Sequence, residues 1–301
     1  MSTSISVLSP RLLDLVDEDA ALERLGAGFV FTEGPIWNRD GGYLLFSDIP
    51  ADVMRRWDPD QGVTEARKPN NQGNGMTYDA AGRLVICEHA TRRVARLEAD
   101  GTSTVLASHF GSTRLNSPND VVIGSDGTVY FTDPTYGVDG EGDLGFRGLY
   151  RINPADGAVE LVDPDFDQPN GLCVSPDGSL LYVNDTERAL IRVFPVNPDG
   201  SLAAARPFFS GITSGIRSDG VPDGMKCDRL GNVYVTGPHG IWIIDPDGAH
   251  LGVIEVPEVA ANLNWGGADW QSLFITASTS LYRITLKVAG RVEPYMKVGR
   301  P

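Results

Sequence analysis

The sequence predicts an all-β fold, a six-bladed β-propeller with a central channel. A unit of two short apolar runs joined by a turn signal recurs six times along the chain, and a third apolar run follows each copy. Corresponding positions in successive copies are 41 to 53 residues apart, a period typical of propellers rather than of shorter solenoid repeats. Units of three or four strands make the propeller the simplest interpretation. A β-sandwich whose strands resemble one another by chance is the alternative.

The clearest copy of the unit is QPNGLCVSPDGSLLYVNDT, residues Gln168–Thr186. It contains an amide residue before a glycine, an apolar run, a Pro-Asp-Gly turn and a second apolar run that ends in an acid. Two apolar runs joined by Asp-Gly are typical of a β-hairpin. The other copies keep this order and are Thr32–Asp48, Gly73–His89, Ser117–Asp133, Val221–Gly237 and the degraded Leu263–Ala277.

The unbroken repeat indicates a single domain over residues 1–301, with blades from about 29 to 290 and a short lead over 1–20 that could form a helix. The segment Leu22–Phe31 is predicted to be a strand. Few residues follow the third strand of the last unit, so we expect this segment to pair with that unit. Such pairing would close the ring and leave no blade with an open edge at the seam.

Composition excludes several classes of partner. The net charge of −15 and the isoelectric point near 4.6 disfavour binding to nucleic acid or to anionic membranes. The first residues lack the basic and apolar segments of a secretory signal, which makes the cytoplasm the expected location. Three cysteines, an odd number with wide spacing, are expected to be reduced core thiols.

One polar residue stands about eight residues before the turn in every copy. Strands within a blade alternate in direction, and the first strand of a blade lines the channel. The polar positions are therefore predicted to form a ring around one mouth of the channel. They are Glu33, Asn74, Asn119, Asn170, Asp223 and Asn264.

Two long loops and a second set of polar residues are expected at the same mouth. The loops are Tyr136–Phe146 and Gly211–Gly220, and loops of this length often bind ligands or act as lids. The second set stands at or just after the ends of second strands and comprises Asp48, His89, Asp133, Asp185 and His239.

The predicted ring offers oxygen atoms to its axis from two carboxylates and four amides. Ca²⁺ and Mg²⁺ prefer oxygen ligands, whereas zinc prefers nitrogen and sulfur. Asn and Asp before glycine also form ordinary turns, but turn formation does not explain the glutamate at position 33. We therefore predict a Ca²⁺ or Mg²⁺ site at the mouth, with the other ring members contacting the ligand.

Several motifs resemble the gluconolactonase and senescence-marker-protein (regucalcin-like) family of sugar lactonases. They are TEGPIW with LLFSDI, GNG before CEHATRRV, NSPNDVV with GTVYFTDPTYG, PNGLCVSPDG with LYVNDT, and PDGMKCDRLGNVYVT, spanning about Phe29–Thr236. The resemblance implies a six-bladed propeller that binds one divalent cation, with Ca²⁺ expected and Mg²⁺, Mn²⁺ and Zn²⁺ as alternatives. It also implies a metal-dependent lactonase that opens gluconolactone-like aldonolactones to aldonic acids.

Carried over position by position, the resemblance places the metal ligands on Glu33, Asn170 and Asp223. It makes Asp223 the general base and Asn119 a contact to substrate or to water. The bound cation is expected to polarise the lactone carbonyl toward attack by water. Ser117 stands where animal members carry an arginine, so their substrate contacts do not transfer.

The remaining polar positions at the mouth are predicted substrate contacts. They are Asn74, Asn264, His89 and His239, and the two histidines are also alternative proton carriers. Two other functions stay open at this stage. One is hydrolysis of organophosphates or other esters on the same site, and the other is a non-catalytic propeller scaffold.

Overall fold

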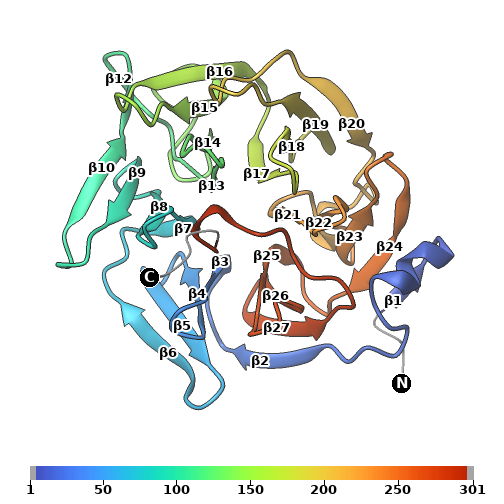
Figure 1. Ribbon diagram of the computed structural model, residues 1–301. Helices are drawn as coiled ribbons and strands as arrows, with labels where there is room; N and C mark the ends of the chain where they lie inside the picture. The colour runs from blue at the N-terminus through green and yellow to red at the C-terminus, as the bar shows by residue number, and fades with distance from the viewer. Residues whose placement is uncertain (1–4, 297–301) are drawn as a thin grey trace.

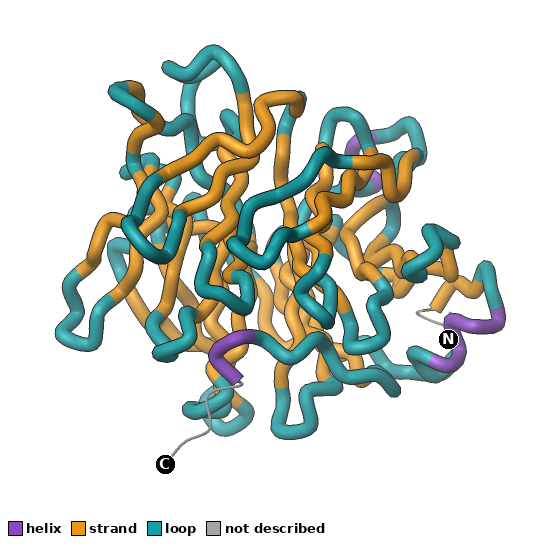
Figure 2. The backbone as a smooth tube through the Cα atoms, turned by 45° about the horizontal axis from the view of Figure 1, so that its top comes forward, coloured by secondary structure: helices purple, strands orange, loops and turns teal. Residues whose placement is uncertain are grey.

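The computed structural model describes residues 5–296 as six antiparallel sheets of four or five strands, set around a common axis like the blades of a disc (Figure 1). Each blade is a meander in which consecutive strands pair, which confirms the predicted six-bladed propeller. Figure 2 shows that the strands run between two faces of the disc, with loops at both faces.

The innermost strand of each blade faces the axis and is the most deeply buried. These strands are β3 (Thr32–Asn38), β7 (Gly73–Tyr78), β13 (Val121–Ile123), β17 (Pro169–Val174), β21 (Met225–Cys227) and β25 (Ala260–Gly266). The second strands are β4 (Tyr43–Asp48), β8 (Leu84–Glu88), β14 (Val129–Asp133), β18 (Leu180–Asp185), β22 (Val233–Gly237) and β26 (Ser272–Ala277).

Third and outer strands complete the blades. The third strands are β5 (Val53–Asp58), β9 (Arg93–Leu97), β15 (Arg147–Ile152), β19 (Leu190–Pro195), β23 (Gly240–Ile244) and β27 (Ser280–Thr285). The outer strands are β6 (Gly62–Arg67), β10 (Ser103–Ala107), β16 (Val159–Phe166), β20 (Arg206–Ser210), β24 (His250–Glu255) and β2 (Glu23–Ala27). A separate hairpin is formed by β11 (His109–Phe110) and β12 (Thr113–Arg114).

The N-terminal segment joins two blades. Strand β2 pairs antiparallel with β27 as the outer strand of the last blade, which is the pairing expected for Leu22–Phe31. The lead is only partly helical: β1 (Ile5–Val7) pairs with β24 as a fifth strand of its blade, and a short 3₁₀ helix, η1 (Pro10–Asp14), follows. First and last parts of the chain therefore hold the ring closed.

Apolar side chains fill the space between neighbouring blades. At the seam between the first and last blades, Phe274 stacks on Trp37 with ring centroids 5.4 Å apart and contacts Trp57. The three cysteines are buried and unpaired, as expected for core thiols, and the Sγ atoms of Cys173 and Cys227 lie 3.4 Å apart.

The segment that follows β27 crosses the channel at the face opposite the ring residues (Figure 1). Arg291 N donates to Cys227 O, its Nε donates to Ser175 O, and the Tyr295 hydroxyl donates to Trp37 O. This segment includes the 3₁₀ helix η3 (Pro294–Met296). The far end of the channel is therefore covered, and the opposite mouth stays open to ligands. Among residues 5–296, no helix is long and apolar enough to cross a membrane.

Candidate active site

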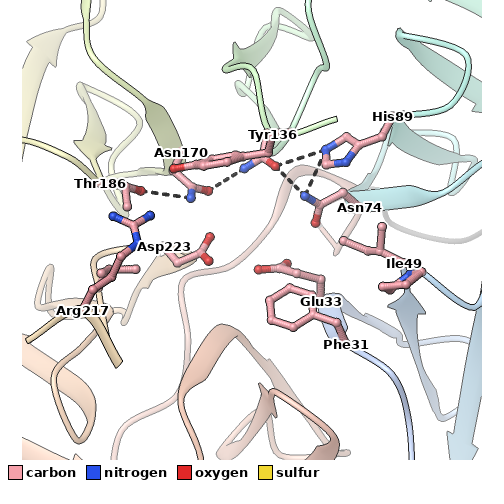
Figure 3. Close-up of a pocket in the computed structure, with 13 residues that line it drawn as sticks. Phe31, Glu33, Ile49, Asn74, His89, Tyr136, Asn170, Thr186, Arg217 and Asp223 are labelled. Atoms are coloured by element: carbon pink, nitrogen blue, oxygen red, sulfur yellow. Dashed lines mark hydrogen bonds between the residues drawn. The ribbon is translucent and has the colours of Figure 1, made fainter. Parts of the chain in front are cut away.

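A cavity of about 300 Å³ opens at the mouth of the channel (Figure 3). Its floor is polar and consists of Glu33, Asn74, His89, Asn119, Asn170 and Asp223. Phe31, Ile49 and Pro50 line one side, and Thr186 and Arg217 lie on the other side (Figure 3). Tyr136 and Val221 also line the cavity. Five of the six predicted ring residues, together with His89, are thus brought into one cavity.

A β-bulge lies beside the ring residue in three of the innermost strands. In β17, Pro169 pairs with Asp185 and the next pair is Leu172 with Val183, so one extra residue stands in the first strand. The same irregularity follows Glu33 in β3 and Gly73 in β7. Bulges re-aim side chains beside functional sites, and the glycine after Asn74 or Asn170 leaves room for the next blade's backbone.

Glu33 and Asp223 point toward each other across the floor (Figure 3). Desolvation and the neighbouring charges of Asp223 and Asp120 raise the pKa of Glu33 well above its usual value. Desolvation and the charge of Asp120 raise the pKa of Asp223 to about 7. Without a cation, the two carboxyl groups therefore retain protons at a pH where exposed acids are ionised.

The ring amides form a hydrogen-bonded chain with a fixed direction (Figure 3). Asn74 Nδ2 donates to Asn119 Oδ1, Asn119 Nδ2 donates to Asn170 Oδ1, and Asn170 Nδ2 donates to Thr186 Oγ1 at 3.1 Å. The Thr186 hydroxyl donates its single proton to Pro222 O at 2.7 Å and can only accept from Asn170. Thr186 therefore holds the Asn170 amide nitrogen on the side of Thr186 and Asp223, and the amide oxygen points toward Asn119.

His89 lies at the beginning of the amide chain. Its Nε2 is 3.4 Å from Asn74 Nδ2 and 3.3 Å from Asn119 Oδ1. Desolvation lowers the pKa of the imidazole to about 4, so His89 is neutral at physiological pH. A neutral imidazole can accept or donate a hydrogen bond to a ligand but adds no charge to the cavity.

Two side chains from the long loops reach the cavity. Tyr136 begins the first loop, and Arg217 lies in the 3₁₀ helix η2 (Arg217–Asp219) of the second. Arg217 Nη1 is 2.8 Å from Glu187 Oε1, and the Arg217 side chain is more than half exposed. The charge of Arg217 acts to lower the pKa of Asp223. The expectation that both loops serve the same mouth is confirmed.

The second set of predicted polar residues is mainly structural. Asp48 Oδ1 accepts from the backbone N–H of Val30 and Phe31, and Asp185 accepts from those of Asp167 and Gln168. Asp133 accepts from Asn116 N at 2.8 Å. These carboxylates satisfy the backbone of the segments that lead into the innermost strands, and none of the three lines the cavity.

Two predicted substrate contacts lie away from the cavity. Asn264 is deeper in β25, where its Nδ2 donates to Pro35 O at 2.9 Å. The ring position of this blade belongs to Ala261, because Gly224 N bonds to Ala261 O in the same way that Gly171 N bonds to Asp223 O. His239 is an exposed turn residue with φ of 70°, whose backbone bonds to Asp219 and Val256.

Residues that the sequence did not single out complete the cavity. Phe31, Ile49 and Thr186 carry no local sign of their role, because apolar and hydroxyl residues are common beside strands. Asp120 had a sign: it follows Asn119 where glycine follows the ring residue in four other blades. Its carboxylate lies below the floor and acts on both Glu33 and Asp223.

The donor set fits a divalent cation of the hard, oxygen-binding type. Glu33 and Asp223 supply two charges that repel each other, and the Asn170 oxygen is held by Thr186 on the side of the other ring amides. No cluster of three His, Cys, Asp or Glu side chains suited to a metal occurs within residues 5–296. A cation here would therefore depend on amide oxygen as well as carboxylate.

Comparison with known proteins identifies the family. Residues 31–279 match the model of the SMP-30/Gluconolactonase/LRE-like region. The chain belongs to this family. Among its relatives is the gluconolactonase of Zymomonas mobilis, 33% identical over 95% of this chain and 87% of that protein. The pentonolactonase of Haloferax volcanii is 28% identical over 87% of this chain and 92% of the relative.

Solved structures of the family share the fold. A gluconolactonase from Xanthomonas campestris superposes with a TM-score of 0.86 at 33% identity, covering 95% of each chain. The calcium-binding regucalcin of Agrobacterium tumefaciens has a TM-score of 0.78 at 21% identity, covering 93% of this chain and 98% of that chain, a likeness of fold. The similarity to these structures therefore covers nearly the whole propeller.

The raised pKa of Asp223 predicts how pH affects the stability of cation-free protein. The folded carboxyl keeps its proton up to about pH 7, whereas the unfolded group releases it near 3.8. Stability contributed by the retained proton is therefore lost as pH rises from about 4 to 7, by up to about 1.4 kcal/mol per pH unit. Urea denaturation in chelator should show this loss for wild type and a smaller one for Asp223→Asn. Parallel curves for the two proteins would contradict the prediction.

The hydroxyl of Thr186 is expected to orient Asn170 for the divalent cation that the donor set fits. In Thr186→Val, the Asn170 amide loses its acceptor and Pro222 O loses its donor, so we expect roughly three- to tenfold weaker Ca²⁺ binding. Thr186→Ser keeps both hydrogen bonds and is the matched control. Calorimetric titration of chelated protein measures both variants, and equal affinities would exclude this role.

Proposed function

We propose that this protein is a divalent-cation-dependent hydrolase that opens sugar lactones, gluconolactone-like aldonolactones, to aldonic acids. One observation carries the proposal: Glu33, Asn170 and Asp223 come from separate blades to one polar floor, beside Asn74 and Asn119. Membership of a family with gluconolactonase and pentonolactonase relatives supports the same substrate class. A cavity of about 300 Å³ lies at the small end of the usual range for small-molecule sites.

Glu33, Asn170 and Asp223 are the proposed cation ligands, with Ca²⁺ as the preferred ion. The carboxylates of Glu33 and Asp223 balance the charge of a divalent cation. Binding of that cation relieves the repulsion between the two carboxylates. The bound ion would supply Lewis acidity at the lactone carbonyl.

Asp223 is proposed to move the proton. In the cation-free protein the pKa of Asp223 is about 7. A bound cation would lower that pKa, so the carboxylate would be ionised and able to accept a proton at physiological pH. Water forms the new bond to the carbonyl carbon as its proton passes to Asp223, and the ring C–O bond then breaks. The proton on Asp223 passes to the departing ring oxygen, which becomes the sugar hydroxyl. His89 lines the same floor as a second proton carrier, whereas His239 lies outside the cavity.

The walls are proposed to orient the sugar. Phe31, Ile49 and Pro50 offer an apolar surface to the C–H face of the ring, and Tyr136 and Arg217 offer hydrogen-bond donors to its hydroxyls. Asn74, Asn119 and His89 contact the substrate from the floor. The amide chain holds these groups in place before substrate arrives, which reduces the cost of ordering them.

Lactone hydrolysis after removal and return of the cation tests the proposal. Chelated protein is assayed by acid release over a panel of hexono- and pentonolactones, with Ca²⁺, Mg²⁺, Mn²⁺ and Zn²⁺ added back separately. We expect hydrolysis to fall to the spontaneous rate on chelation and to return with at least one ion. Full activity in chelator, or no hydrolysis of any lactone with any ion, would refute the proposal.

Replacement of Asp223 should separate chemistry from folding. Asp223→Asn keeps the size and the hydrogen-bonding shape of the side chain but removes the base and one charge, so kcat should fall at least about 100-fold. The circular dichroism spectrum should be unchanged. Asp60→Asn is the matched control, since it makes the same change at an exposed acid in the turn between β5 and β6, outside the cavity. Wild-type kcat in Asp223→Asn would refute the assignment.

A further inference from the structure

A second layer of residues lies directly below the ring. In each blade it is the residue that follows the ring position, as the backbone bonds Gly75 N to Asn119 O, Gly171 N to Asp223 O and Gly224 N to Ala261 O indicate. Four of its six members are glycine, and the other two are Asp120 and Asn262. The complete layer is Gly34, Gly75, Asp120, Gly171, Gly224 and Asn262.

The glycines make room for the two side chains. A Cβ atom on Gly75 would stand 2.3 Å from Asp120 Oδ1, and one on Gly224 would stand 2.1 Å from Asn262 Cγ. Both polar residues are only 2% exposed. Asp120 and Asn262 therefore fill the channel beneath the cavity, in space that the glycines of neighbouring blades leave free.

Asn262 is hydrogen-bonded to one of the proposed cation ligands, and Asp120 is paired with a lysine. Asn262 Nδ2 donates to Glu33 Oε2 at 2.9 Å, which orients that carboxylate. Asp120 Oδ1 accepts from Val121 N, but Asp120 Oδ2 has no hydrogen-bond partner among the described residues. The ammonium of Lys226 lies 3.8 Å from Asp120 Oδ2, and the Lys226 side chain is 12% exposed.

The negative charges of nearby acids explain why Lys226 is buried in the channel. Three desolvated acids, Glu33, Asp223 and Asp120, interact with one another. Burial raises the pKa of Asp120, and the charge of Lys226 opposes that rise. When all are ionised, the three carboxylates and the ammonium of Lys226 carry a net charge of −2 on the axis. Arg217 also lines the cavity, but it is exposed and its charge is paired with that of Glu187. A divalent cation neutralises the net charge on the axis completely, whereas a monovalent or trivalent ion does not.

We propose that the Asp120–Lys226 pair positions and tunes the site by fixing the net charge of the channel, so that the site selects divalent cations by their charge. The inference rests on the proposed cation-dependent function and adds a selectivity role for two residues outside the ligand set. Asp120 sets the number of negative charges, and Lys226 cancels one of them. A change in either residue alone should shift the preferred charge of the bound ion in opposite directions.

Competition between Tb³⁺ and Ca²⁺, ions of similar size, measures this selectivity without reference to activity. In calorimetric titrations of chelated protein, Lys226→Met should raise the Tb³⁺/Ca²⁺ ratio of association constants about tenfold or more, because the channel gains a negative charge. Asp120→Asn should lower the ratio by a similar factor. The double variant should return to the wild-type ratio, since both charges are removed.

Controls separate this effect from other causes. Arg151→Met removes one positive charge from a surface pair with Glu160 in the third blade and should leave the ratio unchanged. Lys226→Gln replaces Lys226→Met if the apolar side chain prevents folding, which circular dichroism reports. Ratios in both single variants that equal the wild-type value overturn the inference alone. Wild-type protein that binds neither ion overturns the cation requirement of the proposed function as well.

Discussion

The repulsion between two acidic side chains in a desolvated channel is the constraint on which the rest of the site depends. Glu33 and Asp223 face each other, and both have raised pKa values because burial desolvates them and the charge of Asp120 acts on both. A flexible chain would separate such groups. Here Glu33 lies in β3 and Asp223 stands two residues before β21, and the ring of blades is closed. The charges can therefore be relieved by protons or by a bound cation.

Closure of the ring and construction of the site use the same contacts. Thr32 Oγ1 in the first blade donates to Ser280 O in the last, and Asn262 of the last blade donates to Glu33 of the first. The apolar seam around Phe274 supports this junction. A loss of closure would therefore displace Glu33 before it affected the fourth and fifth blades, which carry Asn170 and Asp223.

The polar floor is preorganised, whereas the walls are varied. Backbone bulges aim the ring side chains, and the Thr186 hydroxyl gives the amide chain its direction. The walls come from loops that differ in length from blade to blade, with Phe31 and Ile49 on one side and Arg217 on the other. Such a division suits a family whose relatives include both a gluconolactonase and a pentonolactonase, since a shared reaction needs a constant floor and different sugars need different walls.

Sequence alone determined the number of blades, the closing strand and five ring positions, because hairpin turns and Asx-Gly pairs recur at nearly fixed offsets. The repeat pattern is wrong in the last blade, where Ala261 has no polar side chain and Asn262 replaces the glycine. There it assigns the ring position to Asn264. The sequence predicts Asp48 and Asp185 at the mouth but gives no sign that their carboxylates bind backbone N–H groups. Only the tertiary structure decided the direction of the amide chain and the pairing of Asp120 with Lys226. Those features depend on contacts between blades, which leave no periodic trace in a single chain.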